Sequence, residues 1–249
     1  MLNDYPVAHS NNNRGAGDTA PKQAGSIARV SNTVCISRHS GVETIGHSNS
    51  GAGPSDASLD IDNIVCFTSG TGVLTPHRLR MIEDLKAGDI VITRDNGLQP
   101  IRWIGRRTVQ AKNKLAPICF AAGSLPNLTR PLLVSPQHRM LFGNHQSKMY
   151  LGESEVLVCA GHLVNGTTIT RKTGGNVTYL HMLFDRHEIV YADGTASESF
   201  HPRDISMQAI SDKARNEIFG LFPDLRANPS AYGNTARKCL CSHEARMVA

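Results

Sequence analysis

The feature that most constrains this chain is an abrupt change of composition at Cys66. Residues 1–60 are rich in Ser, Asn, Gly, Ala and Thr and contain a single aromatic residue, Tyr5. Such a segment buries too little apolar surface to offset the entropy lost on ordering it. From Cys66 onward the chain consists of short apolar runs separated by turn residues. We therefore expect residues 1–63 to be disordered and the folded domain to begin at residue 64.

The apolar runs predict an all-β fold. Residues 89–93 form a β-branched run, Asn96-Gly97 supplies the positive φ angles of a hairpin turn, and 99–104 read as the returning strand. Short strands with turns every ~8–12 residues are typical of sandwiches and barrels. Other apolar runs expected to form strands or turns of this domain lie at 73–76, 118–121, 132–136, 149–151, 155–159, 167–171, 177–185, 188–191 and 196–200.

The end of the chain has a different pattern. Apolar residues recur close to helical spacing between residues 204 and 222, and Pro223 ends the pattern. We therefore expect a main domain over 64–202 and a C-terminal helical extension over 203–225. Residues 226–249 are polar and unpatterned, which predicts a flexible tail.

Charge and hydropathy argue against nucleic acid and membrane partners. The net charge is +5, yet no run of Lys and Arg exceeds two residues and aromatics are sparse, so a solvated basic surface is favoured over a nucleic-acid interface. No apolar run approaches the ~20 residues that cross a bilayer. The N-terminus lacks the basic and apolar regions of a cleavable export signal. We expect a cytoplasmic protein or one exported without such a signal.

Cys66 is the candidate nucleophile among six scattered cysteines. Its own amide nitrogen is acylated by Val65, so its thiol can attack the carbonyl just upstream. Attack would give a tetrahedral oxyanion and then a thioester, which is an N-to-S acyl shift on an internal substrate. This chemistry needs a base near the thiol, donors for the oxyanion and an acid for the departing nitrogen.

Two sets of residues could supply these groups. Ser135 stands three residues before His138 at the end of an apolar run, where its hydroxyl could orient that histidine or bind the scissile carbonyl. Asp185 precedes His187 by two residues and His181 precedes it by six, so on a strand all three would share one face. A carboxylate beside an imidazole raises its pKa and fixes its orientation. Metal binding by these three groups, or a plain solvated strand face, are the alternatives.

Six blocks of the sequence, in order, resemble one family. They lie at 66–71, 82–91, 93–105, 134–138, 187–194 and 198–200. Together they resemble the Hint domain, the module shared by hedgehog autoprocessing domains and inteins, and more closely the bacterial stand-alone Hint-type proteins. The resemblance covers about residues 64–202.

The resemblance implies a disk-like, all-β fold of two pseudo-symmetric halves in which Cys66 is the nucleophile of an N–S acyl shift. His138 would protonate the departing nitrogen and Ser135 would help to hold the scissile carbonyl. His187 and Asp185 would support the thiol or the later step. The substrate would be the protein's own N-terminal segment and the acceptor water or a small nucleophile. No cofactor or metal is implied, and we expect a monomer.

Two departures from the family pattern restrict the activity that we expect. Ser135 replaces the usual threonine of the Thr-X-X-His block but keeps the hydroxyl. Residues 196–202 contain no asparagine to cyclise, so we expect cleavage on the N-terminal side, as in hedgehog proteins, and no splicing. Val65 is β-branched, which hinders attack and predicts slow cleavage. The alternative is a catalytically inactive Hint fold that serves as an interaction or export-associated module.

Overall fold

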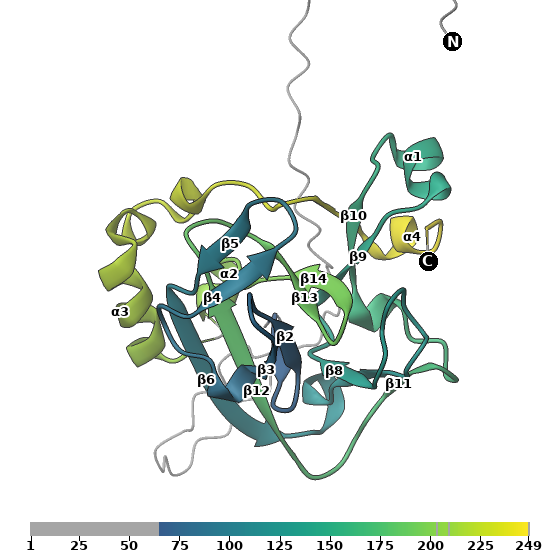
Figure 1. The fold of residues 1–249 in the computed structure, drawn as a ribbon, viewed down its shortest axis with the longest axis horizontal. Helices are drawn as coiled ribbons and strands as arrows, with labels where there is room; N and C mark the ends of the chain where they lie inside the picture. Colours follow the sequence, from purple (N-terminus) through teal and green to yellow (C-terminus); the bar gives the residue numbers. More distant parts are fainter. Residues whose placement is uncertain (1–64, 203, 209, 249) are drawn as a thin grey trace, which may run out of the picture. The chain divides into compact units, whose positions relative to one another are not determined.

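The computed structural model describes residues 65–202, 204–208 and 210–248 (Figure 1). The segment 1–63, for which disorder is expected, lies outside the described residues, as does the proposed boundary at residue 64. The described part is built mainly of short strands in two sheets, so the all-β prediction is confirmed.

The first sheet has six strands in the order β11-β7-β8-β1-β12-β6. Its longest pairing joins β6 to β12 in antiparallel fashion, from Trp103 opposite Leu183 to Gln110 opposite Asn176. The two-residue strand β1 lies between β8 and β12 and pairs with both. The strands are β1 (Phe67–Thr68), β6 (Trp103–Gln110), β7 (Ile118–Phe120), β8 (Leu132–Val134), β11 (Ile169–Arg171) and β12 (Asn176–Leu183).

The second sheet has nine strands. Seven follow the order β15-β10-β9-β14-β13-β2-β3, and β4 pairs with both β13 and β5. The β4–β5 hairpin predicted around Asn96-Gly97 is confirmed, although of these two residues only Gly97, whose φ is 64°, has the expected positive φ. The strands are β2 (Gly72–Leu74), β3 (Leu79–Met81), β4 (Ile90–Thr93), β5 (Gly97–Pro100), β9 (Arg139–Phe142), β10 (Val156–Cys159), β13 (Ile189–Ala192), β14 (Thr195–Glu198) and β15 (Lys238–Cys239).

Helices are short. The run at 149–151 belongs to helix α1, because Asn144 and Ser147 form a capping box at its start and Gly152 takes the left-handed conformation that ends it. The α-helices are α1 (His145–Leu151), α2 (Asp204–Gln208), α3 (Asp212–Leu221) and α4 (Ser242–Ala245). Single 3₁₀ turns lie at Ile82–Asp84, Asn113–Leu115, Ala160–His162, Pro223–Arg226 and Pro229–Tyr232. Within the described residues, no helix is long and apolar enough to cross a membrane.

The C-terminal segment differs from the expected single helix and flexible tail. The helical region is divided into α2 and α3, and Ser211 caps α3 by accepting a hydrogen bond from the Ala214 amide. Further on, β15 pairs in parallel with β10, and Leu240, Ala245 and Val248 are buried in the main core. These few apolar residues have no periodicity of their own. Their burial depends on β10 as a partner, which sequence patterning does not reveal.

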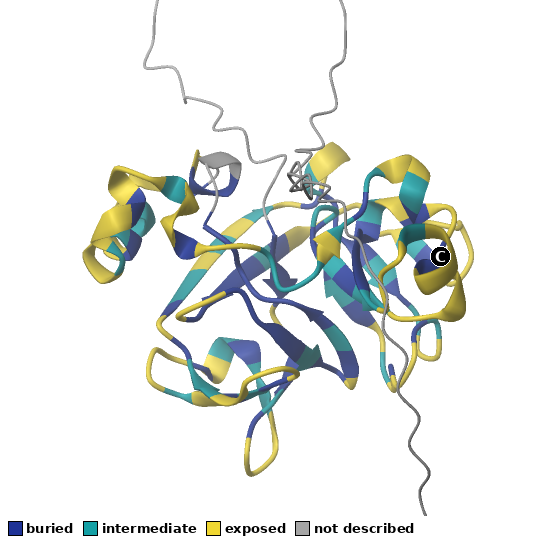
Figure 2. Cartoon of the chain, turned by 90° about the horizontal axis from the view of Figure 1, so that it is seen from above, coloured by how far each residue is buried: buried dark blue, intermediate teal, exposed yellow. Residues whose placement is uncertain are grey.

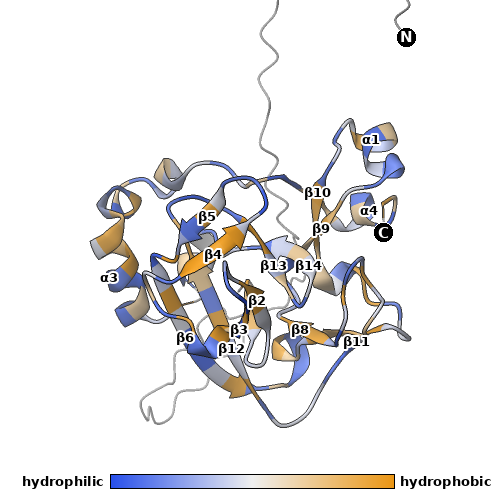
Figure 3. Ribbon diagram, in the orientation of Figure 1, coloured by the Kyte–Doolittle hydropathy of each residue, from blue (hydrophilic) through white to orange (hydrophobic). Residues whose placement is uncertain are grey.

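From Tyr179 to Leu183, strand β12 is buried on both faces and separates two apolar clusters. Leu180 and Met182 point into the main core with Phe67, whereas Leu183 points into a second core with Trp103. The second core also receives Ile218 from α3, whose mixed apolar and polar surface is visible in Figure 3. Figure 2 shows the buried residues running along the strands, with exposed residues in loops and on helices. Cys66 therefore lies beside the part of β12, from Tyr179 to Leu183, that is buried throughout.

Candidate active site at the Val65–Cys66 peptide

Strand register assembles the site around Cys66, which immediately precedes β1. Phe67 pairs with Val134 of β8 on one side and with Leu180 of β12 on the other, both antiparallel. Extending each register by one residue places Cys66 opposite Ser135 and opposite His181. Opposed residues in antiparallel strands project to the same face. The topology therefore directs a hydroxyl and an imidazole to the cysteine.

The peptide bond between Val65 and Cys66 is held at both polar atoms. The Cys66 amide donates a hydrogen bond to Ser135 Oγ at 2.9 Å, and the Ser135 amide donates to the Cys66 carbonyl at 3.0 Å. His181 Nδ1 lies 2.9 Å from the Val65 carbonyl oxygen. Because a carbonyl oxygen only accepts, Nδ1 carries the hydrogen and Nε2 keeps its lone pair. From the sequence, Ser135 was expected to bind the Val65 carbonyl. In the structure, Ser135 instead accepts the hydrogen bond of the Cys66 amide, and His181 binds the Val65 carbonyl.

The thiol of Cys66 lies 3.5 Å from each ring nitrogen of His181. Burial raises the pKa of the Cys66 thiol well above its ordinary value, with a hydrogen bond to Ser135 and the charge of Arg107 acting in the opposite direction. Burial also lowers the pKa of His181 to about 4, against the effect of its bond to the Val65 carbonyl. At neutral pH the resting pair is therefore a protonated thiol and a neutral imidazole with a free lone pair.

His138 lies in the turn that follows β8, where its amide donates to the Ser135 carbonyl at 3.0 Å. Its ring centroid is 4.4 Å from that of Phe67, the residue after Cys66. The side chain is fully buried, and neither ring nitrogen has a hydrogen-bond partner in the described part of the chain. Burial lowers the pKa of His138 to about 4, opposed by the charge of Glu198. Buried polar groups are nearly always paired with protein or water, so His138 is a candidate to act on a further group.

His187 belongs to a separate buried polar cluster. Its Nδ1 accepts a hydrogen bond from the Ala236 amide at 2.9 Å, so its hydrogen is on Nε2, which lies 3.1 Å from the Ser199 carbonyl oxygen and 3.3 Å from Glu198 Oε2. Arg139 Nη1 pairs with the same carboxylate oxygen at 2.9 Å. Burial alone would raise the pKa of Glu198, but Arg139 and His187 hold it well below its usual range. The described contacts of His187 are with this cluster and not with the thiol.

Among the described contacts, Asp185 pairs with neither His181 nor His187. It forms an ion pair with Arg102 at 3.2 Å, and about half of its side chain is exposed. Strand β12 ends at Leu183, so the two-residue alternation that would align residues 181, 185 and 187 stops before Asp185. Among the residues that the structure describes, no three His, Cys, Asp or Glu side chains are grouped as a metal ion would require.

His181 contacts the Cys66 thiol, but the sequence interpretation did not include it among the catalytic residues. The sequence put it on a strand at 177–185, on a face shared with His187, and offered metal binding as one alternative. Its role depends on the pairing of β12 with the two-residue strand β1. A strand so short has no periodicity, so only the topology brings the imidazole to Cys66.

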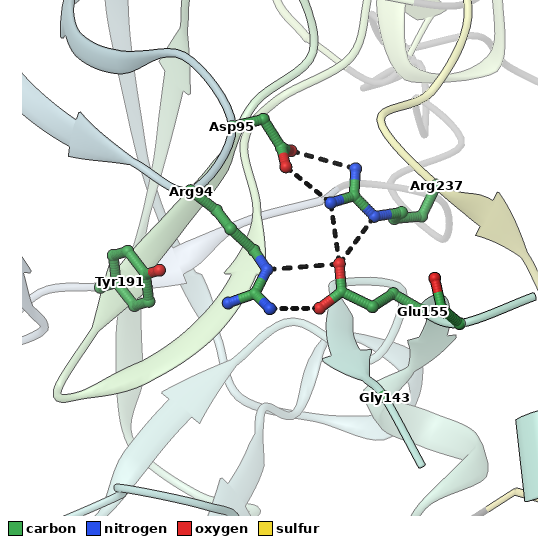
Figure 4. Close-up of a pocket in the computed structure, with 7 residues that line it drawn as sticks. Arg94, Asp95, Gly143, Glu155, Tyr191 and Arg237 are labelled. Atoms are coloured by element: carbon green, nitrogen blue, oxygen red, sulfur yellow. Dashed lines mark hydrogen bonds and ion pairs between the residues drawn. The ribbon is translucent and has the colours of Figure 1, made fainter. Parts of the chain in front are cut away.

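A second polar site lies elsewhere, around Arg94, Asp95, Glu155 and Arg237 (Figure 4). Arg237 Nη2 bonds to Asp95 at 2.6 Å and to Glu155 at 2.8 Å, and Arg94 pairs with the same Glu155. Two cations and two carboxylates thus neutralise one another. This network joins the β4–β5 hairpin to the C-terminal segment and includes none of the residues around Cys66.

Comparison with known proteins places the chain in a family. The model of the Hint domain matches residues 65–204, more than half of the chain, so the protein belongs to the Hint domain family. The resemblance seen in the sequence blocks is thereby confirmed.

Three solved structures are similar to parts of the chain. A bacterial intein-like domain from Clostridium thermocellum shares 16% identity over 55% of this chain and 100% of its own, with a TM-score of 0.42. The gp41-1 intein shares 14% identity over 53% and 96%, with a TM-score of 0.36. The MchDnaB-1 intein shares 9% over 54% and 99%, with a TM-score of 0.37. No curated protein gives a significant match.

Proposed function

We propose that this protein is an autoprocessing Hint protein that breaks its own Val65–Cys66 peptide bond through an N-to-S acyl shift. One observation carries the proposal: this peptide is held at both of its polar atoms beside the thiol. His181 lies 2.9 Å from the Val65 oxygen, and Ser135 Oγ lies 2.9 Å from the Cys66 nitrogen. A structural cysteine needs neither contact, whereas an acyl shift uses both.

The first step is attack on the Val65 carbonyl. The thiol proton passes to Nε2 of His181, and the sulfur electron pair forms a bond to the Val65 carbonyl carbon. The C=O electrons move to oxygen, and the oxyanion is stabilised by the Nδ1–H already directed at it. One imidazole thus serves as base for the sulfur and as donor for the oxygen.

The second step is departure of the Cys66 nitrogen. The C=O bond re-forms, the C–N bond breaks and the nitrogen gains one proton to leave as an amine. His138, with both ring nitrogens unpaired in the described structure, delivers this proton to the nitrogen. Because His138 is neutral at rest, it takes up the proton that His181 removed from the thiol and passes one on, so no further proton is needed. The net change is amide plus thiol to thioester plus amine.

The thioester then passes to water or a small nucleophile. Hydrolysis adds hydroxide to the Val65 carbonyl carbon and a proton to sulfur, releasing residues 1–65 and a chain that begins at Cys66. Because residues 196–202 contain no asparagine, no cyclisation step follows. The β-branched side chain of Val65 makes attack slow.

The test is a time course of intact mass for the full chain, started by refolding from denaturant. We expect fragments 1–65 and 66–249 to accumulate, faster with dithiothreitol, and Cys66→Ala to stay whole. Cys159→Ala is the matched control, since Cys159 is also buried but lies on β10. A wild-type chain that remains whole, with or without the thiol reagent, contradicts the proposal.

One observation favours the inactive module as second candidate. Val65 and Cys66 are only 7% and 1% exposed, so an external nucleophile has little access to the carbonyl. A silent Hint module predicts that dithiothreitol and hydroxylamine leave the peptide intact in the folded state.

A further inference from the structure

The imidazole of His181 is packed against an indole. In the β6–β12 pairing, Gly105 lies opposite His181 and Trp103 lies opposite Leu183, so all four project to one face. A Cβ added to Gly105 would lie 2.1 Å from Cη2 of Trp103. The indole therefore occupies the space left by this glycine. Its ring stacks on His181 with centroids 6.2 Å apart and planes inclined by 23°.

Phe200 packs against the same imidazole. Its ring meets His181 edge-on at 5.1 Å between centroids and lies 6.1 Å from Trp103. We call Trp103 and Phe200 the aromatic wall. Both residues and His181 are buried. The wall keeps water from the imidazole and restricts its rotation, while the Val65 carbonyl holds Nδ1.

The aromatic wall is supported by residues that follow the Hint-matched segment 65–204. Trp103 and Phe200 share their core with five buried residues of the C-terminal helices and turns: Met207, Ile210, Ile218, Leu225 and Tyr232. Glu217 of α3 accepts a hydrogen bond from the indole Nε1–H at 2.8 Å. A buried indole N–H requires such a partner. Helix α3 lies beside β6, in agreement with this contact (Figure 1).

We propose that Trp103 is a positioning residue for His181, and that helix α3 and the turns after it belong to the autoprocessing site because they hold Trp103. This inference rests on the proposed function. Loss of the indole would let water reach His181 and would free its ring to turn away from the Val65 carbonyl. The titratable groups that face His181 are the Cys66 thiol at 3.5 Å and, through its charge, His138. Glu217 bonds to the outer edge of the indole.

The kinetic test compares four variants in the full chain. Trp103→Leu removes the ring and should slow cleavage by roughly 10- to 100-fold, as misplacement of a reacting group does. Trp103→Phe and Glu217→Ala each keep an aromatic ring at position 103 but lose the hydrogen bond between the indole and Glu217. Both should therefore show the same, smaller reduction in cleavage rate. Glu217→Gln keeps an acceptor and should restore the rate.

Phe120→Leu is the matched control, because it removes a buried aromatic ring from the main core without touching His181. It should lower thermal stability while leaving the cleavage rate near that of the wild type. Equal slowing by Phe120→Leu and Trp103→Leu would mean a general loss of stability and would overturn the proposal, as would a Trp103→Leu variant that cleaves normally.

A second test does not depend on cleavage: the His181 ring is titrated by NMR in the full chain carrying Cys66→Ala, which cannot form the thioester. The midpoint should rise from about 4 toward 6.5 in the Trp103→Leu variant and stay unchanged in Phe120→Leu. An unchanged midpoint in Trp103→Leu overturns the positioning role. If the wild type does not cleave, the proposed function fails, whereas this titration still decides whether Trp103 holds His181.

Discussion

At the scale of single residues, the proposed reaction depends on one imidazole, that of His181, which lies near both the Val65 oxygen and the Cys66 sulfur. His181 Nδ1 is directed at the Val65 oxygen, and the thiol lies 3.5 Å from both ring nitrogens. The resting state favours neutral partners, since burial raises the thiol pKa and lowers that of His181. Reaction must therefore create a charged pair inside the protein. In the proposed acyl shift, His181 is the group that would take the thiol proton and so form this pair.

His181→Gln should keep a donor for the Val65 oxygen but remove the base for the thiol. We expect cleavage to slow by roughly 10²- to 10⁴-fold, the usual contribution of general base catalysis. His162→Gln, at an exposed position, serves as control and should cleave normally. The measurement is the rate of fragment formation by intact mass, and equal rates in the two variants would exclude His181 from the chemistry.

Ser135→Ala should leave the buried Cys66 amide without an acceptor. An unsatisfied buried donor costs about 1–3 kcal/mol in free energy of unfolding, measurable by urea titration. Ser135→Thr restores the hydroxyl and should recover both stability and cleavage. If Ser135→Ala were as stable as the wild type, the hydrogen bond from the Cys66 amide to Ser135 would contribute nothing to the free energy of unfolding.

The two buried histidines make stability depend on pH. His138 and His181 have pKa values of about 4 when folded, against 6.5 for the ordinary group. Since the unfolded chain binds these protons more readily, their contribution is fully present above pH 6.5 and is lost as pH falls to about 4. The free energy of unfolding should drop by a few kcal/mol across this window. A smaller drop in His138→Gln than in wild type would verify the assignment, and identical drops would contradict it.

At the scale of elements, strands were predictable and their pairing was not. The β4–β5 hairpin could be predicted because Asn96-Gly97 has a local conformational preference. Strand β1, with only Phe67 and Thr68, has no pattern, yet its two registers bring Ser135 and His181 to Cys66. The expected grouping of Asp185 with His187 assumed a strand that in fact ends at Leu183. Candidate chemistry could thus be predicted from residue types, but its arrangement depended on long-range pairing.

Gly105 on β6 gives a test of element packing. Gly105→Ala places a methyl group 2.1 Å from the indole of Trp103, and such overpacking typically costs about 1–3 kcal/mol. Gly220 on α3 is the matched control, because nothing lies within 4 Å of its Cβ position. Gly220→Ala should stabilise the helix by about 0.5–1 kcal/mol. Thermal unfolding of the two variants should move in opposite directions, and a neutral Gly105→Ala would argue against close packing at this site.

At the scale of the whole molecule, the C-terminal segment is integrated with the Hint domain. Ala236 donates to His187, Arg237 binds Asp95 and Glu155, and β15 extends the second sheet. Residues 226–249 looked like a flexible tail because their apolar residues are few and unpatterned. Their burial depends on surfaces made by the preceding domain, so no local signal could reveal it.

The most direct test of the central claim is mass spectrometry of the full chain refolded in hydroxylamine. A thioester at Cys66 would be captured as a hydroxamate on Val65, giving a fragment 1–65 of that mass and a second fragment beginning at Cys66. The Cys66→Ala chain should give neither. An intact wild-type chain, a cut at another bond, or the 1–65 hydroxamate from the Cys66→Ala chain would contradict the acyl shift at Val65–Cys66.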